Sequence, residues 1–400
     1  MVLFNYSVLP RPIKTLFIPC YLLFLGFVQT PILLVVHALP FMRPKRGWGL
    51  ARTVRVKTWR TSVFVSRTFG KIMVFPDHRA LAPGQNGLWI DPVPESLIVG
   101  RIKDMAAKAG VGPVKLPGYW VDKSGAVVPI GAPPRAGEKV VLHLHGGSYS
   151  FLSATPKDVT RHVGLELLKR CPSIGRVFSI EYRLTTTPDN QPAYPFPTQL
   201  IDALTGYYYL VNTVGFSPAD IILDGDSAGG NLALALTLYL VENRNHESLN
   251  IPPPPGRLLL LSPWTDLSRI PTTPSSSWSR LAGIDYLHPG DIQDKAELFC
   301  GPFGLDEAAV NPYISPASTH PSLSVSFRGF PRTFILCGGS EMLRDQIHVL
   351  RDNMVKDMGD GNVVYYEPPD AVHDFLAVGM SWMEPEWTDS WNEIVKWLGQ

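Results

Sequence analysis

The run Gly225-Asp226-Ser227-Ala228-Gly229 follows a short apolar stretch, Ile221–Asp224, and precedes a long one, Gly230–Val241. The short stretch is typical of a buried strand, and the long one, apolar nearly all round, is typical of a buried helix. The pentapeptide matches Gly-x-Ser-x-Gly, a pattern that places a serine on a sharp turn between a strand and a helix. We therefore expect Ser227 to be a catalytic nucleophile. The N–H of Ala228, at the helix start, is expected to help stabilise a developing oxyanion.

From Tyr119 onward, strand-like and helix-like segments alternate along the chain. This order predicts an α/β fold with a mostly parallel central sheet and helices on both faces. The expected strands are Lys139–His145, Arg176–Tyr182, Ile221–Asp224, Arg257–Leu261, Thr333–Cys337 and Val363–Tyr366. Helices are expected from Thr155-Pro156 onward and over Thr198–Val211, Gly230–Val241 and Trp387–Leu398. We expect amphipathic helices between Trp48 and about Arg101, and we expect residues 48–118 to contribute to a helical cap.

A second glycine-rich run, His145-Gly146-Gly147-Ser148, directly follows an expected strand. Loops of the His-Gly-Gly-Gly type in this place supply backbone N–H groups to an oxyanion hole. We expect Gly146 and Gly147 to be donors, together with Ala228. Ser148 replaces the third glycine of the pattern, and His145 is expected to orient the loop.

The catalytic base is expected in a loop after the last strand, where Asp370–Phe375 contains His373. An imidazole with a pKa near 6.5 can take the serine proton at neutral pH. Two other histidines are weaker candidates for the catalytic base, because His348 falls in an expected helix and His320 in a separate loop.

The third member of a triad is a carboxylate that holds the histidine in the correct tautomer. It is expected after the strand Thr333–Cys337, where Glu341 is the nearer candidate and Asp345 the alternative one helical turn further on. The chain order serine, acid, histidine is that of the α/β-hydrolases.

With these motifs, the sequence resembles the hormone-sensitive-lipase-like carboxylesterases over residues 119–400. Among them it is most similar to membrane-anchored deacetylases of the arylacetamide deacetylase and fungal steryl acetyl hydrolase type. The supporting runs are His145–Ser148, Tyr182-Arg183-Leu184, Pro195–Asp202, Gly225–Gly230, Ser262–Asp266 and Val372–Phe375.

The resemblance implies the α/β-hydrolase fold, Ser227 and His373 in the triad, and Gly146, Gly147 and Ala228 at the oxyanion hole. The family's usual acid is an aspartate in an Asp-x-Leu-x-Asp run. Here Glu341 occupies the first position and Asp345 matches the second, so this sequence departs from the pattern at the acid.

The segment Leu16–Val36 is 21 residues long and carries no charge. A helix of this length can cross the hydrocarbon core of a bilayer. We expect residues 1–47 to be a single-pass membrane anchor and residues 48–400 the catalytic domain. Pro19, Gln29 and Pro31 weaken a straight spanning helix, which leaves a helix on the membrane surface or packed on the protein as alternatives.

The membrane side stays open at this stage. More Lys and Arg follow the segment than precede it, and the positive-inside rule would then hold the catalytic domain in the cytosol. The anchored deacetylases that the sequence resembles instead imply the lumen of the endoplasmic reticulum.

Composition excludes other classes of protein. The net charge is +1 and 45% of the residues are hydrophobic, which argues against a nucleic-acid-binding surface. The four cysteines form no Cys-x-x-Cys pair, so we expect no zinc. Acyl transfer by a serine, a histidine and an acid needs no metal and no organic cofactor, so we expect neither. A Cys171–Cys300 disulfide is left open.

The sequence therefore predicts a serine hydrolase that cleaves short-chain, acetyl-type esters of lipophilic alcohols through an acyl-enzyme. Alternatives are an acyltransferase or amidase with the same triad, a receptor of the same fold that binds a small molecule without turnover, and a membrane scaffold with a vestigial site.

Overall fold

The computed structural model describes residues 9–69, 77–244 and 249–400. In these ranges one sheet of eight strands has the order β1-β2-β4-β3-β5-β6-β7-β8. The strands are β1 (Gly87–Ile90), β2 (Leu116–Asp122), β3 (Lys139–Leu144), β4 (Ile174–Ile180), β5 (Ile221–Asp226), β6 (Arg257–Leu261), β7 (Arg332–Leu336) and β8 (Val363–Tyr366). β2 pairs antiparallel with β1 and β4, and all other neighbours are parallel. The mostly parallel sheet predicted from the sequence is confirmed.

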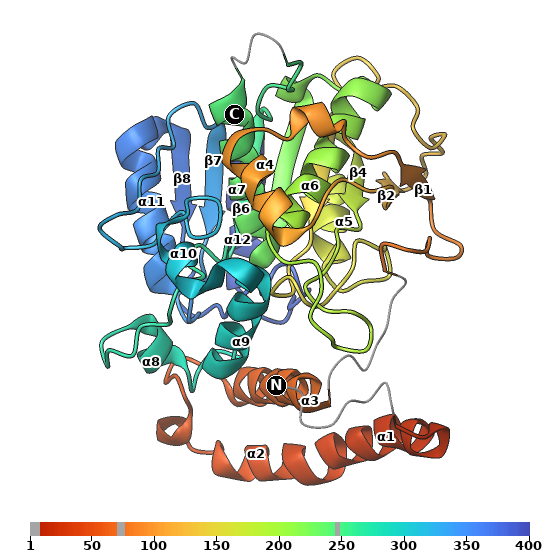
Figure 1. The fold of residues 1–400 in the computed structure, drawn as a ribbon. Helices are drawn as coiled ribbons and strands as arrows, with labels where there is room; N and C mark the ends of the chain where they lie inside the picture. Colours follow the sequence, from red (N-terminus) through yellow and green to blue (C-terminus); the bar gives the residue numbers. More distant parts are fainter. Residues whose placement is uncertain (1–8, 70–76, 245–248) are drawn as a thin grey trace.

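Helices cover both faces of the sheet, as parallel strands joined by crossovers require (Figure 1). The helices that follow β1 in the chain are α4 (Gly100–Ala109), α5 (Arg161–Arg170), α6 (Thr198–Tyr208), α7 (Ala228–Asn243), α8 (Ser277–Leu281), α9 (Pro289–Cys300), α10 (Gly304–Val310), α11 (Arg344–Met358) and α12 (Glu386–Leu398). In Figure 1, α4, α6 and α7 lie in front of the sheet, whereas α5 and α12 lie behind it. The central helix α7 is buried from Ala228 to Leu240, because it packs on β3, β5 and β6.

One local prediction was wrong. The helix expected from Thr155-Pro156 begins only at Arg161, since the Asp158 carboxylate accepts hydrogen bonds from both the N–H and the hydroxyl of Thr160 and stabilises a turn. The helix expected after Trp48 is present as α3 (Leu50–Phe69), and the same stretch also holds an edge strand, Gly87–Ile90, which pairs with β2 and was not expected.

The N-terminal part forms two layers below the sheet (Figure 1). α1 (Arg11–Leu23), a π-helical turn η2 (Phe24–Gln29) and α2 (Thr30–Val36) join into one helical rod, named here the N-terminal rod. α3 (Leu50–Phe69) runs between the rod and the catalytic domain. Within the rod, Pro12–Val36 has a mean hydropathy of 2.0 and is exposed, and it is the one helix in the described ranges long and apolar enough to cross a membrane.

Candidate active site

Ser227 lies on a strained turn between β5 and α7. Its φ of 50° and ψ of −114° lie outside the regions that L-residues favour. The neighbouring glycines make this turn possible. A Cβ on Gly225 would lie 2.3 Å from the carbonyl oxygen of Gly229, and a Cβ on Gly229 would lie 1.9 Å from that of Leu144. The local geometry predicted from the pentapeptide is therefore present.

His373 lies in the loop after β8 and reaches Ser227 from a position far along the chain. Its Nε2 is 3.0 Å from the Ser227 hydroxyl oxygen, which is hydrogen-bond distance. Both side chains are buried, and the Tyr286 ring lies beside the imidazole. The structure brings together the nucleophile and base that the sequence predicted.

Glu341 lies on the other side of the imidazole. Its Oε1 is 3.7 Å from His373 Nδ1, which is longer than a hydrogen bond. Its Oε2 accepts hydrogen bonds from the Ser262 hydroxyl at 2.6 Å and the Gly338 N–H at 2.7 Å. Within the described residues, Oε1 and Nδ1 have no other hydrogen-bond partner, although both are buried. A small approach of the two groups would satisfy both atoms.

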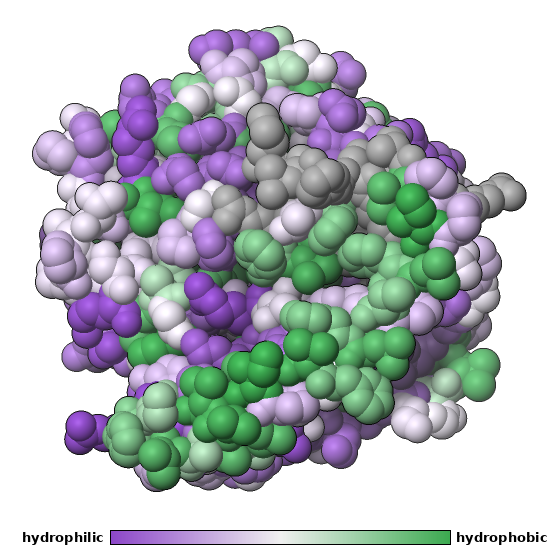
Figure 2. All heavy atoms as spheres, turned by 90° about the horizontal axis from the view of Figure 1, so that it is seen from below, coloured by the Kyte–Doolittle hydropathy of each residue, from purple (hydrophilic) through white to green (hydrophobic). Residues whose placement is uncertain are grey.

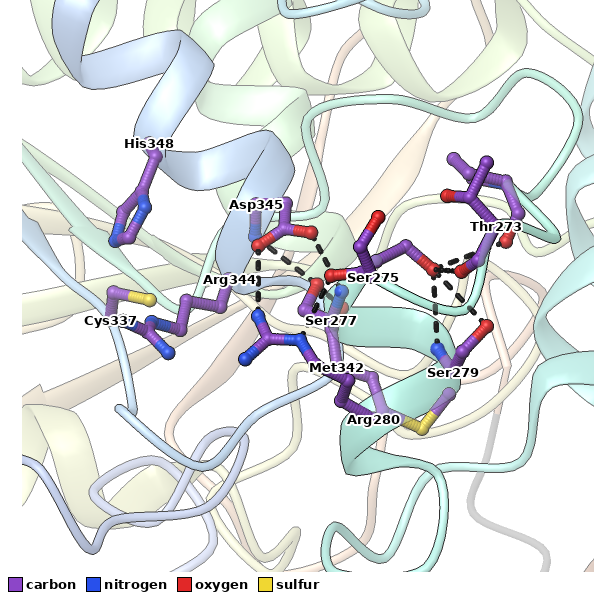
Figure 3. Close-up of polar contacts among 12 residues, drawn as sticks. Thr273, Ser275, Ser277, Ser279, Arg280, Cys337, Met342, Arg344, Asp345 and His348 are labelled. Carbon is purple, nitrogen blue, oxygen red and sulfur yellow. Dashed lines mark hydrogen bonds and ion pairs between the residues drawn. The ribbon is translucent and has the colours of Figure 1, made fainter.

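Asp345, the alternative acid, faces Ser277 and Arg280 (Figure 3). Its Oδ2 accepts a hydrogen bond from the Ser277 N–H at 2.6 Å, at the start of α8, and its Oδ1 is 3.9 Å from Arg280. The competing His348 lies near Asp345 on α11, where its Nε2 contacts Glu367 at 2.6 Å. His320 is exposed in its loop. None of these three residues lines the cavity that contains Ser227 and His373.

The His145–Ser148 loop follows β3 and borders the same site. His145 stacks on Tyr182, with ring centroids 4.2 Å apart, and burial lowers the pKa of His145 to about 3. This histidine is therefore neutral and holds the loop. Gly147 and Ser148 have φ values of 97° and 52° and line the cavity over Ser227. The Gly146 N–H instead contacts the buried Asp226 carboxylate.

Three buried carboxyl groups near His373 were not singled out in the sequence. Asp374 Oδ2 is 3.1 Å from His373 Nε2, the same atom that faces Ser227. Burial alone would lower the pKa of His373, but the carboxylates of Asp374 and Glu341 raise it well above its ordinary value. Burial raises the pKa of Asp285 to about 6 and that of Asp226 well above its ordinary value. The imidazole therefore lies among buried carboxyl groups whose pKa values differ.

Lys45 joins the two loops that carry the triad candidates. Its Nζ donates to the Ser340 hydroxyl at 2.6 Å and to the Pro369 carbonyl at 2.7 Å, and it pairs with Asp370 at 2.7 Å. Ser340 precedes Glu341, and Asp370 lies in the His373 loop. No sequence signal marks this contact, because it joins positions about 300 residues apart.

A largely apolar cavity of about 550 Å³ opens above Ser227 and His373. Its walls come from the catalytic loops, from the start of α9 and from the N-terminal helices. Of residues 48–118, α3 and residues 77–79 line it, whereas β1, α4 and β2 do not. The N-terminal rod also contributes lining residues, namely Phe17, Ile18, Tyr21 and Leu22.

In residues 9–69, 77–244 and 249–400, no group of three or more His, Cys, Asp or Glu side chains could hold a metal ion. All four cysteines are free, so the Cys171–Cys300 pair left open by the sequence is not a disulfide. Of the four, only Cys20, on α1, is exposed.

Comparison with known proteins gives relatives over most of the chain. A family model described as alpha/beta hydrolase fold matches residues 141–377. An acetyl-hydrolase of Streptomyces hygroscopicus is 30% identical over 241 residues, which cover 60% of this chain and 69% of that protein. Steryl acetyl hydrolase 1 of Saccharomyces cerevisiae is 29% identical over 140 residues, which cover 35% of this chain and 30% of that protein. A solved hormone-sensitive lipase from a metagenome library is 28% identical with a TM-score of 0.54, and the match covers 71% of this chain and 81% of that one.

Proposed function

The chain belongs to the hormone-sensitive-lipase-like branch of the α/β-hydrolase family and is a carboxylic ester hydrolase, and we propose that it cleaves short-chain esters of lipophilic alcohols through an acyl-enzyme on Ser227. The observation that carries the proposal is the 3.0 Å approach of His373 Nε2 to the Ser227 hydroxyl on a strained turn below an apolar cavity.

In the proposed first step, His373 takes the Ser227 proton while the hydroxyl oxygen attacks the ester carbonyl. The imidazolium that forms is stabilised by Glu341, whose free Oε1 faces Nδ1. The imidazolium then protonates the leaving alcohol. Water, activated by the same imidazole, hydrolyses the acyl-enzyme.

The developing oxyanion is assigned to the N–H groups of Gly147 and Ala228. Gly147 lines the cavity, and Ala228 is the first residue of α7, so its N–H has no acceptor within the helix. Gly146 was expected to be a third donor. Because its N–H contacts Asp226, we assign it to fixing the loop.

The preference for a lipophilic alcohol rests on two observations. The cavity is lined mainly by apolar side chains, and it is bounded by a helix apolar enough to enter a membrane. Relatives named acetyl-hydrolase and steryl acetyl hydrolase support this substrate class. We further propose that the N-terminal rod attaches the protein to a membrane. The resemblance to anchored deacetylases suggests the membrane of the endoplasmic reticulum.

The test is hydrolysis of p-nitrophenyl esters of increasing acyl length by the detergent-solubilised protein and by its Ser227→Ala variant. We expect the highest kcat/KM for acetate and loss of turnover in the variant. Preference for acyl chains beyond about eight carbons would contradict the short-chain proposal. Equal rates for the two proteins would contradict the role of Ser227.

A further inference from the structure

Charge is distributed very unevenly along this chain. Residues 1–76 contain 11 Lys and Arg and no Asp or Glu, whereas the other 324 residues contain 25 Lys and Arg and 35 Asp and Glu. The near-zero net charge thus combines a basic N-terminal part with an acidic remainder. Basic segments beside apolar helices are attracted to membrane surfaces that carry anionic headgroups.

The N-terminal rod lies along α3, and polar side chains fix which side of the rod faces inward. Tyr21 Oη lies 2.9 Å from the Ser62 hydroxyl oxygen, and the Gln29 side-chain amide donates to the Thr61 hydroxyl at 2.7 Å. α3 is in turn fixed to the catalytic domain, because Arg60 donates to the carbonyls of Asp285 and Leu287. Rod, α3 and catalytic domain are therefore connected by specific contacts.

The outward side of the rod is apolar and exposed. Phe27 and Val35 are 78% and 77% exposed, and Phe41, just after the rod, is 73% exposed. Figure 2, a view from below, shows hydrophobic side chains gathered in a band across this face of the molecule. Nothing in the described parts of the chain covers these three side chains.

This arrangement does not suit a rod that crosses the bilayer. α3 lies alongside the rod and carries Arg52, Arg55, Lys57 and Arg60. A spanning rod would hold these cations at the depth of the hydrocarbon core, where Lys and Arg are strongly disfavoured. A rod lying flat in one leaflet leaves α3 and its cations at the level of the headgroups.

The cavity connects this face to the reactive serine. Phe17, Ile18 and Leu22 of the rod line the same cavity as Ser227 and His373, and Trp59 and Val63 of α3 line it between them. A lipophilic molecule dissolved in the leaflet would therefore reach Ser227 along apolar side chains without passing through water.

We propose that the N-terminal rod lies in the plane of one leaflet of a membrane with anionic headgroups, and that lipophilic esters pass from this leaflet between α1 and α3 to Ser227. The membrane geometry stands on the rod and the charges alone. The entry route rests on the proposed function.

The first test is the topology of the full-length protein in microsomes, with one epitope tag at the N-terminus and another at the C-terminus. A rod in one leaflet leaves both ends on the same side, so added protease should remove both tags or neither. Removal of one tag only would show a spanning rod and overturn the proposal. This result does not depend on catalysis.

The second test compares membrane binding of variants by flotation with vesicles of phosphatidylcholine, with and without phosphatidylserine. Phe27→Asp/Val35→Asp should reduce vesicle binding at least about tenfold, because it places two charges on the apolar side. The matched control is Val127→Asp, since Val127 is 93% exposed in the loop between β2 and β3. Arg46→Glu, at an exposed position before α3, should weaken binding about fivefold or more only when phosphatidylserine is present. Equal binding of all variants, or self-association without vesicle binding, would contradict the proposal that the rod binds to a membrane surface.

The entry route is tested with the same double variant and two substrates. Its turnover of a sterol acetate dissolved in vesicles should fall at least about tenfold, whereas its turnover of soluble p-nitrophenyl acetate should stay within about twofold. Retained activity on the soluble ester shows that the variant is folded. Equal loss on both esters, or none on either, would contradict the route. If the wild-type protein binds vesicles but hydrolyses neither ester, the proposed function fails and the membrane geometry stands.

Discussion

Replacing each of the two candidate acids separately decides which carboxylate assists His373. Glu341→Gln keeps the size of a fully buried side chain whose Oε2 accepts hydrogen bonds from Ser262 and the Gly338 N–H. The glutamine oxygen can keep those two bonds. Its NH₂ group would then face His373 Nδ1 and favour the tautomer with the proton on Nε2, which cannot accept the serine proton.

The expected size of this effect is large. An acid-to-amide change in a Ser-His-Asp triad lowers kcat by about 10⁴ while leaving the geometry intact. Because the hydrogen bonds on Oε2 are retained, the free energy of unfolding should change by no more than about 1–2 kcal/mol.

Asp345→Asn is the matched control on the same segment. Asp345 is half-exposed, accepts from the Ser277 N–H at the start of α8 and lies 3.9 Å from Arg280. Losing its charge there should cost about 0.3–1 kcal/mol of stability and leave kcat within about twofold.

The assay is kcat and KM for p-nitrophenyl acetate near neutral pH, with thermal unfolding of each variant. The reasoning fails if Asp345→Asn loses more than about a hundredfold in kcat while Glu341→Gln stays near wild type. If Glu341→Gln is inactive only because it is unfolded, its inactivity does not support Glu341 as the acid. The assignment is then retained only if a Glu341→Asp variant is well folded and partly active.

Three further substitutions test the surroundings of the triad. Asp374→Asn removes a carboxylate that raises the pKa of His373. Because the neutral imidazole is the active form, the acid limb of the kcat/KM profile should move to lower pH, and a shift to higher pH would contradict this. Lys45→Met removes the contacts between the two triad loops and should lower kcat about tenfold. Lys139→Met, at the first residue of β3, removes an ion pair with Asp220 and should not lower kcat. Equal effects of the two substitutions on kcat would show a general loss of stability. Gly229→Ala places a Cβ 1.9 Å from a backbone oxygen of β3 and should destabilise the protein by about 3 kcal/mol or more in denaturant unfolding, so a fully stable variant would contradict the packing of the turn.

Features with a local signature could be predicted from the sequence. The turn at Ser227 and the loop at Gly147 each need glycine where a side chain would collide with backbone, and such positions leave a mark in a single stretch of chain. The central strands could be predicted for the same reason, since each is a short apolar run between turn residues. The places expected for Ser227 and His373, each directly after a strand, followed from the alternation of strands and helices along the chain.

Features that depend on distant contacts could not be predicted. β1 is a four-residue edge strand whose pairing with β2 outweighs its weak local pattern. The approach of Asp374 to the reactive nitrogen of His373 and the bridge from Lys45 arise only when loops far apart in sequence fold together. The length of the N-terminal rod could be predicted, but its packing along α3 depends on Tyr21 and Gln29, which carry no such signal in isolation.

A covalent acyl-enzyme on Ser227 can be detected by rapid mixing with p-nitrophenyl acetate, acid quench and peptide mapping by mass spectrometry. We expect a burst of p-nitrophenol close to one equivalent and a single acetyl group on the peptide that contains Ser227, with neither in Ser227→Ala. A burst without acetylation of that peptide, or acetylation that persists in the alanine variant, would contradict an acyl-enzyme on Ser227.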